Sequence, residues 1–139
     1  MHVLLVDDNP HEVFFVRQAL KRIGQPVKLS VLQDGAQALA FLFQQDPYTR
    51  VEQPDMVLLD LNMPNKNGFE VLAALEGDPQ LKVIPVIMYT TSSLPAEITR
   101  CYELGANAYL TKPLGLEDLY ALLRATVEFW SKCKLRTSA

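Results

Sequence analysis

Short apolar segments alternate with stretches of helical periodicity along the whole chain. The apolar segments are rich in valine, leucine and isoleucine and lack a regular polar alternation, which is typical of strands covered on both faces. We predict strands at residues 3–6, 29–32, 56–59, 86–89 and 108–110.

Helical periodicity fills the intervals between these segments. Val13, Val16, Leu20 and Ile23 recur at spacings of three and four, and Gly24 follows as a stop signal. Further helices are predicted at residues 37–43, 69–75, 96–104 and about 116–132. Five strand–helix units with right-handed crossovers predict an α/β fold, in which a doubly wound parallel sheet carries helices on both faces.

The length of 139 residues, with 49% hydrophobic content, suits one domain spanning residues 1–139. One connection is long, at residues 44–54, where about 4–6 residues are usual. Two readings of it stay open: a lengthened second helix with a solvated loop, or a contact with a specific partner through Tyr48 and Arg50.

Charge and cysteine content exclude several classes of protein. Thirteen basic against 16 acidic residues give a net charge of −3, which argues against a nucleic-acid binder. Cys101 and Cys133 are too few for a disulfide framework or a zinc cluster, so we expect free thiols. The initial apolar run is too short for a secretory signal, and no stretch reaches the roughly 18 apolar residues of a membrane span. We therefore expect a cytoplasmic protein without a membrane partner.

Polar residues follow the predicted strands, at the edge where ligands bind in such sheets. Asp7 and Asp8 follow the first strand, Asp60 the third and Thr90 the fourth, while the fifth runs into Lys112. Three carboxylates placed together repel one another unless a cation joins them, and Mg²⁺ suits such oxygen ligands. A carboxylate nucleophile there could form an aspartyl-phosphate, with its charge neutralised by the metal and Lys112. Helix capping could explain one acid after the first strand, but not two acids together with Asp60.

These residues in this order resemble the receiver domain of two-component response regulators. The matching elements are Asp7-Asp8, the run Asp60-Leu61-Asn62-Met63-Pro64 with Gly68, Thr90, Tyr109 and Lys112-Pro113. The resemblance covers residues 3 to about 127 and implies a flavodoxin-like strand order of 2-1-3-4-5. Pro64, Gly68 and Pro113 would have structural roles.

The resemblance also implies the roles of the acidic residues. Asp60 would be the phosphoacceptor, which takes a phosphoryl group from a phosphohistidine of a sensor histidine kinase. Asp8 would bind Mg²⁺ directly, Asp7 mainly through water, and Asn62 through its backbone carbonyl. His2 and His11 are expected to be exposed bystanders, so that the histidine comes from another protein.

Three further residues would act on the phosphoryl group or respond to it. Thr90 would donate a hydrogen bond to a phosphoryl oxygen, and Lys112 would form an ion pair with it. Tyr109 would be a switch whose ring turns inward when Thr90 moves, and the Lys112–Pro113 bond would be cis. The protein would not be an enzyme beyond accepting and hydrolysing the phosphoryl group, and it would act through a downstream protein or a phosphotransfer protein.

A narrower resemblance comes from the long connection, the opening VDDNP and the sequence Glu128-Phe129-Trp130. These features are similar to stand-alone regulators paired with cyanobacterial and bacterial phytochrome kinases. Phe129 and Trp130 lie about 100° apart on a helix, so one of them should protrude. Either a homodimer forms through the fourth helix, fifth strand and fifth helix, or the helix end wraps its own domain.

Two positions depart from the family's pattern. Tyr89 stands where most members carry an aliphatic residue, and Gly115 is a weak cap for the last helix.

Two other functions are less well supported by the sequence. A magnesium-dependent phosphatase with an aspartyl nucleophile would need a second acid at the position of Asn62. A flavin or nucleotide binder lacks support, because the chain has neither a GxxxxGK[ST] nor a GxGxxG run.

Overall fold

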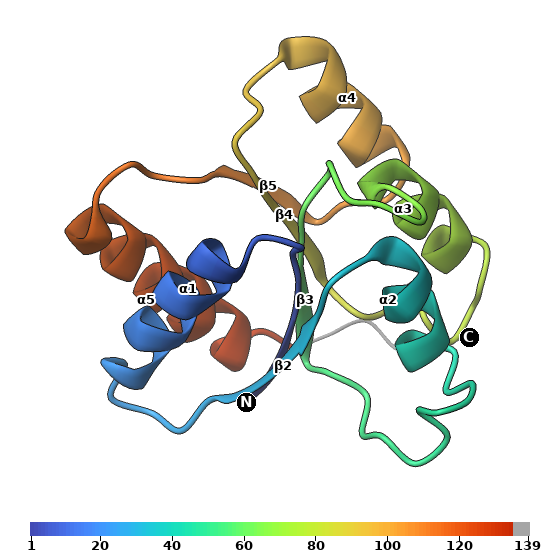
Figure 1. Ribbon diagram of the computed structural model, residues 1–139, viewed down its shortest axis with the longest axis horizontal. Coiled ribbons are helices and arrows are strands. Elements are labelled where there is room, and N and C mark those ends of the chain that lie inside the picture. Colours follow the sequence, from blue (N-terminus) through green and yellow to red (C-terminus); the bar gives the residue numbers. More distant parts are fainter. Residues whose placement is uncertain (135–139) are drawn as a thin grey trace.

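The computed structural model describes residues 1–134. Its centre is a parallel sheet with the strand order β2-β1-β3-β4-β5, which confirms the predicted fold (Figure 1). The strands are β1 (His2–Val6), β2 (Lys28–Leu32), β3 (Met56–Leu59), β4 (Val86–Thr90) and β5 (Ala108–Thr111). The last five residues of the predicted domain lie outside the described residues.

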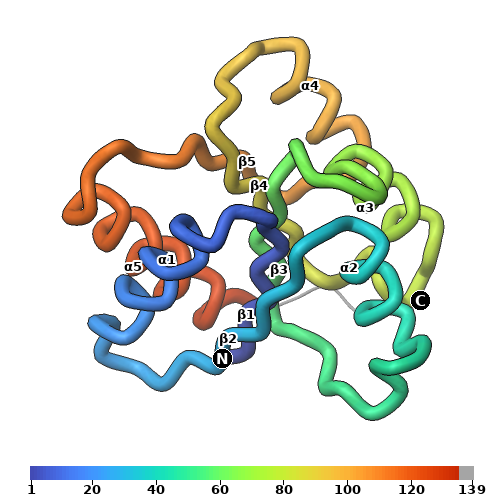
Figure 2. The backbone as a smooth tube through the Cα atoms, viewed as in Figure 1, coloured from blue at the N-terminus to red at the C-terminus, as the bar shows by residue number. Residues whose placement is uncertain are grey.

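Helices cover both faces of the sheet, as Figures 1 and 2 show: α1 and α5 lie together on one face, and α2, α3 and α4 lie on the other. Their bounds are α1 (Pro10–Lys21), α2 (Gly35–Leu42), α3 (Gly68–Glu76), α4 (Pro95–Glu103) and α5 (Leu116–Lys132). None of the helices within residues 1–134 combines the length and the hydropathy of a membrane-crossing segment.

Each face of the sheet has its own apolar core. Leu5 and Leu58 point toward the helices α1 and α5, and Leu123 of α5 belongs to the same core. Leu4 and Leu59 face the opposite helices. All five side chains are at most 1% exposed, because the central strands are covered on both sides. This explains why the strand sequences lack a polar alternation.

The residue that caps the start of α1 is neither Asp7 nor Asp8. Asn9 is the N-cap, and its side chain accepts hydrogen bonds from the backbone N–H groups of His11 and Glu12. Pro10 occupies the first turn, where a missing N–H costs nothing. Asp7 and Asp8 therefore do not cap this helix.

The long connection is an irregular loop from residue 43 to residue 55, since α2 ends at Leu42. Tyr48 packs inward against Phe41, with ring centroids 5.4 Å apart, so its ring contributes to the protein's own core. Arg50 is exposed. The structure thus contradicts the lengthened second helix, and it makes Tyr48 a packing residue.

Candidate functional site

The three acidic residues meet at the carboxyl edge of the sheet. Val6 and Leu59 are paired in register, so Asp7, Asp8 and Asp60 follow two neighbouring strands directly. One carboxylate oxygen of each lies within 4.8 Å of the others. Asp7 and Asp60 are buried and Asp8 is exposed. The sequence-predicted acidic cluster is therefore present in the structure.

Lys112 reaches into this cluster from the end of β5. Its backbone N–H donates to the carbonyl of Thr90 at 2.8 Å, which fixes the start of the side chain beside β4. Its Nζ lies 2.8 Å from Asp7 Oδ2 and 3.2 Å from Asp60 Oδ2. The side chain is only 6% exposed, so this ammonium is a buried bridge between two buried carboxylates.

The charges at the edge do not balance. Burial lowers the pKa of Lys112, but the hydrogen bond to Asp7 and the charges of Asp60 and Asp7 raise that pKa by more, so the ammonium form is favoured. One ammonium among three carboxylates leaves an excess of two negative charges. A divalent cation with oxygen ligands fits this excess.

Thr90 offers an unused hydrogen-bonding group. It is the last residue of β4 and is fully buried, and its Oγ1 has no hydrogen-bond partner among the described residues. A buried hydroxyl without a partner costs about 1–3 kcal/mol, so it calls for an explanation. A ligand that brings an acceptor to this edge would supply the partner.

The segment after Asp60 folds back tightly on itself. Gly68 donates its N–H to the carbonyl of Leu61 at 2.9 Å, and a Cβ at Gly68 would lie 2.6 Å from the carbonyl oxygen of Asp60. Asn62 directs its backbone N–H to Asp60 Oδ1 at 3.5 Å. Pro64 is exposed within this turn. Glycine is thus required at position 68 by the close approach of two backbone segments.

Tyr109 and Pro113 take positions beside the cluster. The hydroxyl of Tyr109 donates to the carbonyl of Ser92 at 2.9 Å, and the half-buried ring packs against the core under α2, α3 and α4. The peptide bond from Lys112 to Pro113 is trans, so the expected cis bond was wrong. Proline accepts both isomers within about 0.5–1 kcal/mol, so the Lys-Pro pair alone did not determine the isomer.

One of the two histidines differs from what the sequence suggested. His2 is only 7% exposed, with Nε2 2.8 Å from Ser30 Oγ, so its description as an exposed bystander was wrong. The cause is that β1 begins at His2 and pairs there with Lys28. His2 lies at the opposite end of β1 from the acids, and His11 is exposed as expected.

Tyr89, which departs from the family's pattern, contacts Lys112 through the face of its ring. It is 1% exposed, and Lys112 Nζ lies over its ring, 5.5 Å from the centroid. The hydroxyl has no hydrogen-bond partner among the described residues. Burial, together with the charges of Glu12, Asp7 and Asp60, raises the pKa of this hydroxyl, so Tyr89 stays neutral.

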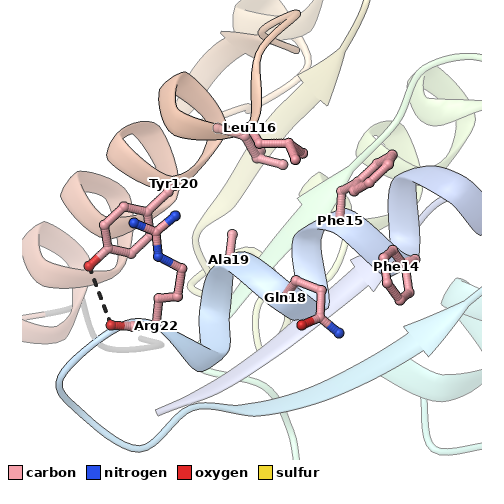
Figure 3. A pocket seen from close by; sticks show the side chains of 8 residues that line it. Phe14, Phe15, Gln18, Ala19, Arg22, Leu116 and Tyr120 are labelled. Atoms are coloured by element: carbon pink, nitrogen blue, oxygen red, sulfur yellow. Dashed lines mark hydrogen bonds between the residues drawn. The ribbon is translucent and has the colours of Figure 1, made fainter.

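A groove between α1 and α5 was not foreseen from the sequence (Figure 3). Phe14 and Phe15 line it from α1 and are 55% and 37% exposed. Arg22 and Tyr120 line its other end (Figure 3). The guanidinium carbon of Arg22 lies 3.9 Å from the centroid of the Tyr120 ring, and the Tyr120 hydroxyl donates a hydrogen bond to the backbone carbonyl of Arg22. The signal available in the sequence was the pair of successive phenylalanines at positions 14 and 15.

Comparison with known proteins agrees with this geometry. The family described as the response regulator receiver domain matches residues 3–124. The response regulator Rcp1 of Synechocystis sp. is 41% identical over 128 residues, which are 92% of this chain and 87% of that protein.

Solved structures give the same result. The phosphorylated cyanobacterial phytochrome response regulator RcpA has a TM-score of 0.92 at 36% identity, with 98% of each chain covered. The Mn²⁺-bound form of Rcp1 has a TM-score of 0.89 at 39% identity, covering 98% of this chain and 99% of that one. With its acids and lysine at the same edge of such a sheet, this chain belongs to the response regulator receiver domain family.

Proposed function

We propose that this protein accepts a phosphoryl group on Asp60 from a phosphohistidine of a sensor histidine kinase and signals through a change of its surface. The observation that carries the proposal is the buried bridge of Lys112 between Asp60 and Asp7. It gives Asp60 a cationic neighbour at the place where phosphoryl charge would develop.

The transfer follows from the groups around Asp60. An oxygen of Asp60 forms a bond to phosphorus while the bond from phosphorus to the histidine nitrogen breaks. Lys112 compensates the charge of the phosphoryl oxygens, and the unpartnered hydroxyl of Thr90 donates a hydrogen bond to one of them. The protein's own chemistry then ends with hydrolysis of the aspartyl-phosphate.

Asp7, Asp8, Asp60 and the backbone carbonyl of Asn62 would hold Mg²⁺. The excess of two negative charges and the oxygen donors support this choice of cation. The metal, when bound, neutralises charge on the transferring group. Rcp1 has been solved with Mn²⁺, another cation that prefers oxygen ligands.

Thr90 and Tyr109 would form the switch. A phosphoryl group adds about −1.5 to −2 charges and three acceptor oxygens, which would draw the Thr90 hydroxyl toward it. Tyr109 is tied to the carbonyl of Ser92, two residues beyond Thr90, so movement of this segment would reach the tyrosine. The surface formed by α4, β5 and α5 would change in response.

A homodimer through that surface belongs to the same proposal. Phe129 is 62% exposed, while Trp130 packs against the core under α5. Phe129, Leu122 and Leu110 line an apolar groove between β5 and α5. An isologous contact would cover this groove.

We assign the phosphodonor to a phytochrome kinase in the cytoplasm, because RcpA is a phytochrome response regulator. The test is transfer from a purified, phosphorylated phytochrome kinase to the wild type and to Asp60→Asn, under red and far-red light. We expect label on the wild type alone, at a rate that changes with the light. Equal labelling of both proteins would contradict the assignment of Asp60, and transfer that ignores light would contradict the phytochrome link.

A multiple-turnover assay on small phosphomonoesters separates this function from a phosphatase. A receiver retains at most one phosphoryl group per chain, whereas a phosphatase would turn over small phosphomonoesters continuously. Asn62 stands where the phosphatase would need its second acid, and this supports the receiver. Output then passes to a downstream protein or a phosphotransfer protein.

A further inference from the structure

We propose that Tyr89 is a positioning residue of the phosphotransfer site, whose ring face holds the Lys112 ammonium between Asp7 and Asp60. This inference rests on the proposed function, because it concerns the lysine that would compensate the phosphoryl charge. The observation behind it is the placement of Lys112 Nζ over the Tyr89 ring at 5.5 Å from the centroid.

Lys112 needs an anchor besides its two carboxylates. Its side chain has four rotatable bonds, and ordering such a chain costs up to about 1.5–2 kcal/mol. The ammonium has three N–H donors, and the hydrogen bonds to Asp7 and Asp60 use two of them. Asp60 is also the group whose charge would change in the reaction, so a contact that does not depend on Asp60 keeps the ammonium in place.

Tyr89 is itself held rigidly. It lies in β4, which pairs with β3 on one side and β5 on the other, and its side chain is among the largest that are fully buried. Leu110 of β5 is its partner in register, and the next residue, Thr90, accepts the backbone N–H of Lys112 at 2.8 Å. The ring and the lysine backbone are therefore fixed by the same pair of strands.

The ring supplies something that an aliphatic side chain cannot. The face of an aromatic ring carries negative potential and attracts a cation within about 6 Å, and the attraction is stronger where both groups are removed from water. The side chain of Lys112 is 6% exposed and Tyr89 is 1% exposed, so both groups meet this condition. A leucine at position 89 would fill space but leave the ammonium to its carboxylates.

The test compares Tyr89→Leu with Tyr89→Phe, which keeps the ring and removes only the hydroxyl. Each protein is phosphorylated by acetyl phosphate at saturating Mg²⁺, in the reaction where the Asp60 oxygen bonds to phosphorus and acetate leaves. We expect Tyr89→Phe to react within about twofold of the wild type, and Tyr89→Leu about two- to thirtyfold more slowly. Equal rates for Tyr89→Leu and the wild type would overturn the proposal.

A double-mutant cycle separates the contact from general packing. In a Lys112→Ala background, Tyr89→Leu should cause no further slowing, because the ammonium is already absent. Slowing of the same size in both backgrounds would show a packing effect and overturn the proposal. Tyr89→Met is the second non-aromatic variant if Tyr89→Leu fails to fold.

A spectroscopic signature tests the contact without any phosphorylation. Protons over an aromatic face are shifted upfield in NMR, so the ε-methylene protons of Lys112 should be shifted in the wild type and in Tyr89→Phe but not in Tyr89→Leu. Unshifted protons in the wild type would overturn the proposal. If Asp60→Asn were phosphorylated as fast as the wild type, the proposed function would fail, while the NMR result would still decide the contact.

Discussion

At the scale of single residues, Gly68 shows how closely the backbone approaches Asp60, the proposed phosphoacceptor. A Cβ there would lie 2.6 Å from the carbonyl oxygen of Asp60, a group that cannot move without moving Asp60 itself. We expect Gly68→Ala to lower the free energy of unfolding in urea by about 1–3 kcal/mol, as overpacking does.

Gly77 provides the matched control for that substitution. Its φ is −77°, and an added Cβ would meet nothing closer than 3.7 Å. Gly77→Ala should therefore leave stability unchanged or raise it by up to about 1 kcal/mol, because it restricts the unfolded chain. The explanation for Gly68 would be wrong if both variants unfolded at the same urea concentration as the wild type.

His2 predicts a pH dependence of stability. Burial, reinforced by the charge of Lys28, lowers the pKa of its imidazole below 6.5, although Asp55 and Glu52 oppose the shift. As the pH falls through 6.5, the unfolded chain takes up a proton at His2 that the folded chain does not. The free energy of unfolding should therefore decrease on acidification, through the window between 6.5 and the lower folded pKa.

The measurement compares unfolding of the wild type and His2→Gln across that window. The glutamine amide can donate a hydrogen bond to Ser30 Oγ or accept one from it, but it does not titrate. We expect the wild type to lose more stability than His2→Gln on acidification. Parallel pH curves for the two proteins would show that His2 does not contribute.

At the scale of elements, α5 begins without a side-chain cap. Gly115 is its N-cap, and a Cβ there would meet only Asp118 Oδ2, at 3.8 Å. Gly115→Ser should raise the free energy of unfolding by a few tenths of a kcal/mol, and it should exceed Gly115→Ala by about 1 kcal/mol. Thermal unfolding of the three proteins checks this order, and an alanine variant as stable as the serine variant would refute it.

The end of α5 carries the prediction about assembly. Phe129→Ala removes a large, exposed apolar side chain of the groove between β5 and α5, so it should weaken a dimer. Sedimentation velocity of the wild type and the variant gives the measurement, with Phe14→Ala on α1 as an equally apolar control outside that groove. A wild type that stays monomeric, with and without phosphorylation, would contradict the homodimer.

Elements were predictable from the sequence to different degrees. The five strands were found within two residues of their ends, because strands buried on both faces are continuous apolar runs. The start of α1 at Pro10 lies ahead of its first apolar residue, and the signal for it was the pair Asn9-Pro10. The inward packing of Tyr48 depends on contacts with Phe41 across the loop, which periodicity does not encode.

At the scale of the whole molecule, parallel strand order explains why the acidic cluster was predictable. Residues that follow neighbouring parallel strands meet at one edge, so Asp7, Asp8 and Asp60 could be grouped from sequence alone. The side-chain contacts at that edge could not be predicted. The bridge of Lys112 and its place over the Tyr89 ring depend on a chain with four rotatable bonds, which spacing does not determine.

The net charge of −3 is not spread evenly over the molecule. At the carboxyl edge of the sheet, the single positive charge of Lys112 balances only one of three carboxylates. A divalent cation bound there would reduce the repulsion that the carboxylates exert on the proposed phosphoryl group.

The most direct measurement is the intact mass of the protein after incubation with acetyl phosphate and Mg²⁺. We predict that the wild type gains the mass of one phosphoryl group, and that neither Asp60→Asn nor the wild type with the metal chelated gains any. Phosphorylation of Asp60→Asn to the same extent as the wild type would contradict the proposal that Asp60 accepts the phosphoryl group.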